Sequence, residues 1–157
     1  SIAVVPPCII GGKKPAYSQS VAKTRITLHS TKLDSPHNQR FWLYAAVDPE
    51  TNAFLHVRLF PTRTIVLTKQ FLQELTEKHD VADSLFLVDG APWLQAALFE
   101  LSLRFQHVTH GNRNAVERLF KELKRRTEQF ATHFRHATAN SAETWLQTFA
   151  FAWNQLI

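Results

Sequence analysis

The chain has 157 residues, which is enough for one domain with a sizeable hydrophobic core. Its 18 Lys and Arg outnumber its 13 Asp and Glu, giving a net charge of +5 and a pI near 9.7, so a polyanion such as nucleic acid is the favoured partner. Cys8 is the only cysteine, which excludes an intramolecular disulfide and a cysteine-based zinc site and favours a reducing, cytoplasmic setting. No apolar run is long enough for a membrane span, so we expect no membrane partner.

Residues 1–23 contain prolines and glycines but no sustained hydrophobic period, which predicts a loosely ordered lead-in before a single domain over residues 24–157. Three strands are predicted next, because β-branched and aromatic residues alternate or run together over 25–33, 40–47 and 53–60. The Pro-containing turn "DPETN", which begins at Asp48, joins the second and third of these strands. These two strands should therefore be antiparallel neighbours.

Helices and strands then alternate to the end of the chain. Apolar residues at helical spacing predict helices over 64–78, 93–102 and 114–130, separated by strands over 84–88 and 105–109. A last helix is predicted after Asn140, which should cap it while Glu143 reaches back. It carries an apolar stripe of Trp145, Phe149, Trp153 and Leu156. The order βββαβαβα predicts an α/β fold with a mixed five-stranded sheet flanked by helices, as in the ribonuclease H-like fold, although other mixed topologies share this pattern.

Three segments resemble one known family in the same order and at similar spacing. They are "RFWLYAAVDPETN" (40–52), "FLVDGAPWLQAAL" (86–98) and "HVTHGNRNAVERLFKELKRRT" (107–127). These segments are similar to insertion-sequence transposases of the DDE type from archaea and bacteria. The resemblance extends from Arg25 to the end of the chain and implies a catalytic domain with a ribonuclease H-like fold.

The resemblance implies metal-dependent DNA chemistry. Transposases of this type cleave DNA and join it to a target with two divalent ions, Mg²⁺ or Mn²⁺, that stabilise the attacking and leaving oxygens. The implied partners are DNA, as transposon ends and as target, and further copies of the chain in a homo-oligomer. Asp89, at the end of the 84–88 strand, matches the family's second acid, and Glu117, early in the 114–130 helix, matches the third. Both are implied metal ligands, since Mg²⁺ prefers carboxylate oxygens.

Both acids also have structural interpretations. Asp89 precedes Gly90, and Asp-Gly commonly starts a tight turn. Glu117 lies one helical turn from Lys121, with which it could form an ion pair on a solvated helix face. Four basic residues of this segment are predicted to contact DNA phosphates: Arg113, Lys121, Lys124 and Arg125. A solvated charged face is the alternative for them.

The family's first acid is missing. Aligning the chain on Trp42 puts that acid at Ser30, which we take as the catalytic position, whereas aligning on Thr31 puts it at His29. Neither residue is an acid, and imidazole is a poor ligand for Mg²⁺. Asp34 is the nearest acid, but it precedes Ser-Pro, as a turn residue would. Loss of one carboxylate weakens the hold on both metal ions, so DNA cleavage should fall by orders of magnitude.

The sequence therefore supports more than one function. The first is a transposase catalytic domain for DNA cleavage and strand transfer, impaired by the missing acid. The alternative is a noncatalytic transposase remnant that binds DNA or intact transposase subunits, and a third is a doubly wound α/β domain that uses Asp89 for Mg²⁺ and a small phosphorylated ligand. Residues 1–23 hold no counterpart of the family's helix-turn-helix, so we expect a truncated or decayed copy of a mobile element. His107 and His110 are further candidates for DNA contact, with capping or surface roles as alternatives.

Overall fold

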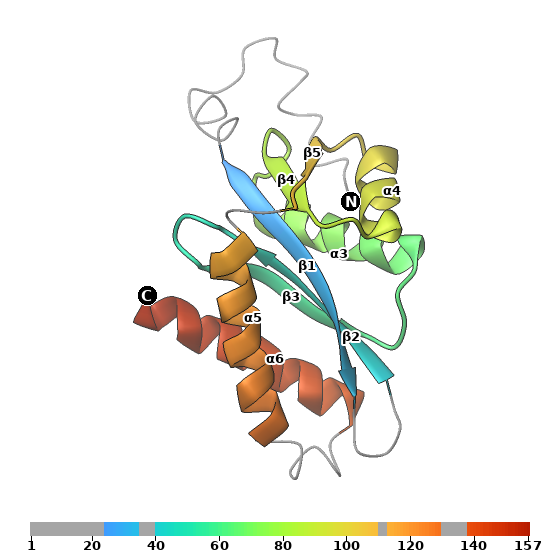
Figure 1. Ribbon diagram of the computed structural model, residues 1–157. Helices are drawn as coiled ribbons and strands as arrows, with labels where there is room; N and C mark the ends of the chain where they lie inside the picture. The colour runs from blue at the N-terminus through green and yellow to red at the C-terminus, as the bar shows by residue number, and fades with distance from the viewer. Residues whose placement is uncertain (1–23, 35–39, 110–112, 130–137) are drawn as a thin grey trace.

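The computed structural model describes residues 24–34, 40–109, 113–129 and 138–157 (Figure 1). The side chains of residues 34, 113–116 and 127–129 lie outside this description, as does the lead-in predicted over residues 1–23. The described chain is an α/β structure in which one mixed sheet has helices on both faces (Figure 1).

Five strands form the mixed sheet that the sequence predicts. They are β1 (Arg25–Asp34), β2 (Arg40–Val47), β3 (Phe54–Phe60), β4 (Leu85–Val88) and β5 (Phe105–His107), in the order β3-β2-β1-β4-β5. Neighbours among β1, β2 and β3 are antiparallel, whereas β4 pairs parallel with both β1 and β5. The observed strands lie close to the predicted ranges, except that β5 ends at His107.

The turn between β2 and β3 gives Asp48 the structural role that the sequence predicts. Its Oδ1 accepts a hydrogen bond from the backbone N–H of Glu50 at 2.9 Å, and its own backbone N–H donates to the carbonyl oxygen of Ala53 at 3.0 Å. Asn52 has a φ of 60°, in the left-handed region that Asn tolerates. These contacts close the predicted antiparallel hairpin.

The described residues contain the helices α3 (Ile65–Lys78), α4 (Pro92–Glu100), α5 (Arg113–Gln129) and α6 (Ala139–Leu156). Thr64 caps α3 by accepting a hydrogen bond from the N–H of Leu67 at 3.2 Å. The predicted cap of the last helix was wrong, because Asn140 already lies within α6. Thr138 has the extended backbone of a capping residue and accepts the N–H of Ser141 at 3.3 Å. None of these described helices is both long and apolar enough to cross a membrane.

The sheet separates two hydrophobic cores. The first core joins the sheet to α3 and α4 and includes Ile26, Leu28, Tyr44, Phe71, Phe86, Val88 and Leu94. The second core joins the sheet to α5 and α6 and includes Leu43, Ala45, Val57, Leu119, Phe120, Leu123 and Leu146. Successive strand residues alternate between the two cores, since neighbouring side chains of a strand point to opposite faces. Helices α3 and α4 lie on one side of the sheet and α5 and α6 on the other (Figure 1), so each side chain of β1 points to one helix layer or to the other.

Helix α6 covers the edge strand β3. The predicted partner of Glu143 was wrong, because its Oε1 accepts the backbone N–H of Leu59 at 3.3 Å and pairs with Arg58 Nε at 3.0 Å. The side-chain amide of Asn154 bonds both backbone groups of Phe54, at 2.8 and 2.7 Å. These bonds occupy backbone groups that an open edge would offer to another strand.

The apolar stripe predicted for α6 is correct in part. Trp145, Phe149 and Trp153 pack against the second core, but Leu156 is 84% exposed. Small residues, Ala142 and Ala150, are buried between them. A helix that approaches the sheet through alanines needs fewer large side chains on its buried face.

Candidate functional site

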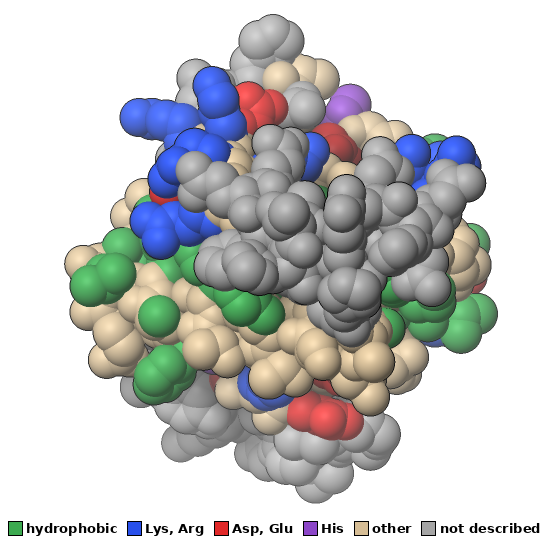
Figure 2. Space-filling view, turned by 90° about the horizontal axis from the view of Figure 1, so that it is seen from below, with side chains coloured by type: hydrophobic (Ala, Val, Ile, Leu, Met, Phe, Trp, Pro, Cys, Tyr) green, Lys and Arg blue, Asp and Glu red, His purple; other side chains and the backbone are tan. Residues whose placement is uncertain are grey.

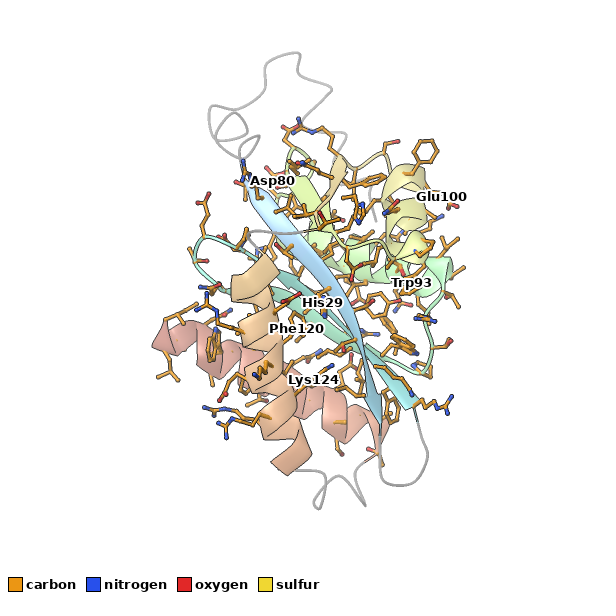
Figure 3. The ribbon with its side chains drawn as sticks, viewed as in Figure 1. His29, Asp80, Trp93, Glu100, Phe120 and Lys124 are labelled. Atoms are coloured by element: carbon orange, nitrogen blue, oxygen red, sulfur yellow. The ribbon has the colours of Figure 1, made fainter. Side chains whose placement is uncertain are left out.

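The register of β1 against β2 decides which residues of β1 face α5. Residues directly opposite each other in an antiparallel pair share one face of the sheet. His29 lies opposite Ala45 of the second core, whereas Ser30 lies opposite Tyr44 of the first core. The His29 ring packs against the ring of Phe120 on α5, with centroids 4.3 Å apart. Figure 3 shows His29 on β1 and Phe120 on α5, the helix beside that strand.

Ser30, which we predicted to share a site with Glu117, lies on the wrong face for that role. Because adjacent side chains of a strand point to opposite faces, Ser30 is directed toward α3 and α4. His29 is directed toward α5, and it lines the same depression as Glu117. The sequence left both registers open, and a slip of one residue exchanges the two faces of a strand.

A depression with a volume of about 610 Å³ lies between β1 and α5. We call it the α5 depression, and it is lined by His29, Glu117, Arg118, Phe120, Lys121, Glu122, Lys124 and Arg125. The structure therefore brings together four of the predicted site residues and His29. Arg118, Phe120 and Glu122 were missed as site residues.

Positive charge predominates in the α5 depression, where four cationic side chains face two carboxylates. Glu122 accepts hydrogen bonds from Arg125 at 2.8 and 3.0 Å and from Arg126 at 2.8 Å, and these bonds lower the pKa of Glu122 to about 2. Glu122 is thus paired with two arginines. Figure 2 shows Lys and Arg side chains gathered on one part of the surface, with acidic side chains beside them.

Asp89 directly follows β4. Phe86 and Val88 belong to the first core, so alternation directs Asp89 to the other face, which is the face of α5. Strands β1 and β4 are parallel, and continuing their register past Val88 places Asp89 beside His29. Asp89 also has a turn role, because its Oδ1 accepts the backbone N–H of Ala91 at 3.2 Å. It is not among the residues that line the α5 depression.

The residues of this region do not fit a pair of magnesium ions. Mg²⁺ requires oxygen ligands, above all carboxylates, and the β1 position nearest α5 holds His29 instead of an acid. Within the described ranges, no group of three or more His, Cys, Asp or Glu side chains is placed to hold a metal ion. The cations of the α5 depression would also repel a divalent ion.

Several other predicted site residues are not among the described residues that line the α5 depression. The side chains of Arg113 and Asp34 lie outside the described residues, although the backbone of Asp34 is opposite Arg40 at the end of β1. His107 is exposed at the end of β5, where a Cβ on Gly90 would lie 3.5 Å from its Nε2. His110 also lies outside the described residues.

A second cluster of polar and aromatic side chains was not predicted. Arg63, between β3 and α3, lies over the rings of Trp42 and Trp93, with its guanidinium carbon 4.3 Å from each centroid. These residues are far apart in the sequence and share no motif, so no sequence signal could have joined them. The contact holds the start of α3 to the first turn of α4 on the side of the first core.

No protein-family model matches the chain. It is 34% identical over 118 residues to the uncharacterized protein MJ0017 of Methanocaldococcus jannaschii, an alignment that covers 72% of this chain and 53% of the relative. It is 43% identical over 51 residues to the uncharacterized protein aq_aa24 of Aquifex aeolicus, covering 32% of this chain and 42% of the relative. The chain thus spans about half the length of the curated relatives it matches.

The fold is shared with solved structures. Among them is a chain from the simian T-cell lymphotropic virus intasome in complex with the PP2A regulatory subunit B56 gamma, with a TM-score of 0.59 and 18% identity. The alignment covers 76% of this chain and 45% of that chain. At this identity the likeness concerns the fold alone.

Proposed function

We propose that the chain is a domain of the DDE transposase type, with a ribonuclease H-like fold, that binds DNA through α5 and has lost most or all of its ability to cleave it. One observation carries the proposal. His29 of β1 and Glu117 of α5 line the α5 depression together with Lys121 and Lys124. In this proposal, His29 occupies the first position of a DDE site and Glu117 the third.

The arrangement of the elements supports the proposed fold. Two antiparallel hairpin connections lead into strands parallel to β1, and α3 with α4 and α5 with α6 cover opposite faces. The shared fold with a chain of a viral intasome is consistent with a ribonuclease H-like domain that acts on DNA. The sequence motifs around Asp89 and Glu117 support the narrower assignment to the transposase type.

The charge of α5 supports DNA as the partner. Arg118, Lys121 and Lys124 line the α5 depression together with Arg125. Duplex DNA offers phosphates at regular spacing, and Lys and Arg bind them through charge and hydrogen bonds irrespective of sequence. The expected binding is therefore weak, insensitive to sequence and strongly dependent on salt.

The replacement of the first acid supports impaired cleavage. In-line displacement with two metal ions needs carboxylates that fix both ions near the reacting oxygens. His29 cannot supply an oxygen ligand, so Asp89 and Glu117 would have to hold both ions between them. We therefore expect no strand cleavage or strand transfer by the unaltered chain with Mg²⁺ or Mn²⁺.

Binding and cleavage assays on the same duplex test the proposal. Fluorescence anisotropy at low salt should show binding by the unaltered chain, and the double substitution Lys121→Glu and Lys124→Glu should abolish it. The single variant Lys121→Glu is compared with Lys69→Glu, a charge reversal of the same size, because Lys69 is paired with Glu100 at 2.9 Å and lies on α3, on the other face of the sheet. Equal loss in the α5 and control variants, absence of binding at low salt, or efficient cleavage by the unaltered chain would contradict the proposal.

A further inference from the structure

We propose that the α5 depression seats a DNA phosphate directly, with no divalent ion between protein and DNA. The inference rests on the proposed function and states how the same surface recognises its ligand. A site that holds metal ions in the family would then hold an anion in this chain. The difference from the family site lies at His29, a residue of β1 that faces α5 and contacts Phe120.

The lining of the α5 depression has the composition of an anion site. Lys121 and Lys124 stand one turn apart on α5, and Arg118 lies one turn before Lys121. Glu122, which would offset this charge, is engaged by Arg125 and Arg126 through short hydrogen bonds. Glu117 remains as the other carboxylate of the lining. A phosphodiester, with one negative charge and several acceptor oxygens, complements this set of donors.

The same lining disfavours a divalent ion. A carboxylate at position 29 would add a negative charge and two oxygen ligands next to Glu117, whereas imidazole adds neither. Asp89 is directed to this side of the sheet, but its Oδ1 accepts the N–H of Ala91. A divalent ion at His29 would thus meet four cationic side chains and two carboxylates, one of which, Glu122, is bonded to Arg125 and Arg126.

Phe120 keeps His29 in this position. The two rings are in contact, and Phe120 is only 3% exposed in the second core. The imidazole therefore occupies space between β1 and α5 that a shorter Asp side chain and a hydrated ion would otherwise share. The aromatic contact makes the histidine a packed part of the structure, so its role is distinct from that of a surface histidine.

Metal and DNA binding by the purified chain, without any activity assay, test this inference. The readouts are the electron paramagnetic resonance signal of free Mn²⁺, and anisotropy of a labelled duplex in EDTA and in Mg²⁺ at equal ionic strength. The unaltered chain should bind DNA equally well in EDTA and in Mg²⁺, and it should leave the Mn²⁺ signal unchanged. His29→Asp should bind Mn²⁺ and should bind DNA about tenfold more weakly in EDTA, since it places a carboxylate beside the phosphate.

Two controls make the result specific. Ser30→Asp adds the same charge at the next residue but on the other face, so it should bind no Mn²⁺ and should change DNA affinity less than His29→Asp does. His29→Asn keeps a neutral side chain, so it should retain metal-independent DNA binding if His29→Asp fails to fold, as judged by circular dichroism. DNA binding that disappears in EDTA, Mn²⁺ binding by the unaltered chain, or a folded His29→Asp that binds no Mn²⁺ would overturn the inference. Absence of DNA binding in every buffer would instead overturn the proposed function.

Discussion

Substitution of Lys121 by alanine should reduce the salt dependence of DNA binding by a defined amount. By this account three side chains of the α5 depression contact DNA phosphates: Arg118, Lys121 and Lys124. Arg125 is left out because Glu122 holds its guanidinium at 2.8 and 3.0 Å. Each contact adds about −0.9 to the slope of log affinity against log salt concentration, so the slope should be about −2.7 for the unaltered chain and about −1.8 for Lys121→Ala.

The slopes translate into affinities that are easy to separate. Between about 50 and 200 mM salt, the affinity of the unaltered chain should fall about 40-fold, and that of Lys121→Ala about 12-fold. Anisotropy titrations of one labelled duplex over this range, in EDTA, measure both values. Lys69→Ala removes an equal charge from α3, where Lys69 is paired with Glu100, and should leave the slope unchanged. An unaltered slope for Lys121→Ala, or the same change for Lys69→Ala, would refute the reasoning.

Three further predictions concern the framework that holds this surface. Burial lowers the pKa of His56, so the unfolded chain takes up a proton at higher pH than the folded chain does. The free energy of unfolding should therefore fall as the pH drops below about 6.5. Urea unfolding should show a weaker pH dependence for His56→Gln, and an unchanged dependence would contradict this role of His56. Phe120→Ala should lower the free energy of unfolding, measured with urea, by about 3–5 kcal/mol, because Phe120 is 3% exposed. Phe99 is 78% exposed, so Phe99→Ala should lower it by less than about 0.5 kcal/mol. Similar losses for both variants would show that the second core is misplaced. Asn154→Leu should lower the free energy of unfolding by about 1–3 kcal/mol, because it leaves both backbone groups of Phe54 without their side-chain partner. It should also promote self-association through β3. An unchanged mass in light scattering together with unchanged urea unfolding would disprove the role of this amide.

Much of the fold could be predicted because its signals are local. Alternation in β1 and β3, the apolar run of β2, the Asp48 turn and the helical period of α3 each depend on a few neighbouring residues. The cap of α6 was misplaced because Thr138 and Asn140 are both good capping residues, and only the backbone conformation distinguishes them. Local signals therefore predicted the elements well and their ends less well.

The candidate site was predicted in part for a related reason. The motifs gave Asp89, Glu117 and the basic residues of α5, but the choice between Ser30 and His29 depends on strand register. That register is set by contacts with β2, whose partners Tyr44 and Ala45 belong to opposite cores. The residues of β1 alone do not carry this information.

Contacts between distant segments gave no sequence signal at all. The packing of His29 on Phe120 joins a strand to a helix that follows much later, and the stacking of Arg63 with Trp42 and Trp93 joins a strand, a loop and a helix. Both contacts arise from packing of the whole domain, and their residue types are common in hydrophobic cores and on surfaces alike.

The central claim is that DNA contacts this domain at the α5 depression, and backbone amide NMR tests it most directly. The chain has a mass of 18.0 kDa, so its amide resonances can be followed individually during titration with a short duplex in EDTA. The account predicts the largest shifts over residues 117–125 of α5 and at His29, with little change at Lys69 on α3. Shifts concentrated on α3, α4 or the Trp42–Arg63–Trp93 cluster, with α5 unaffected, would contradict it.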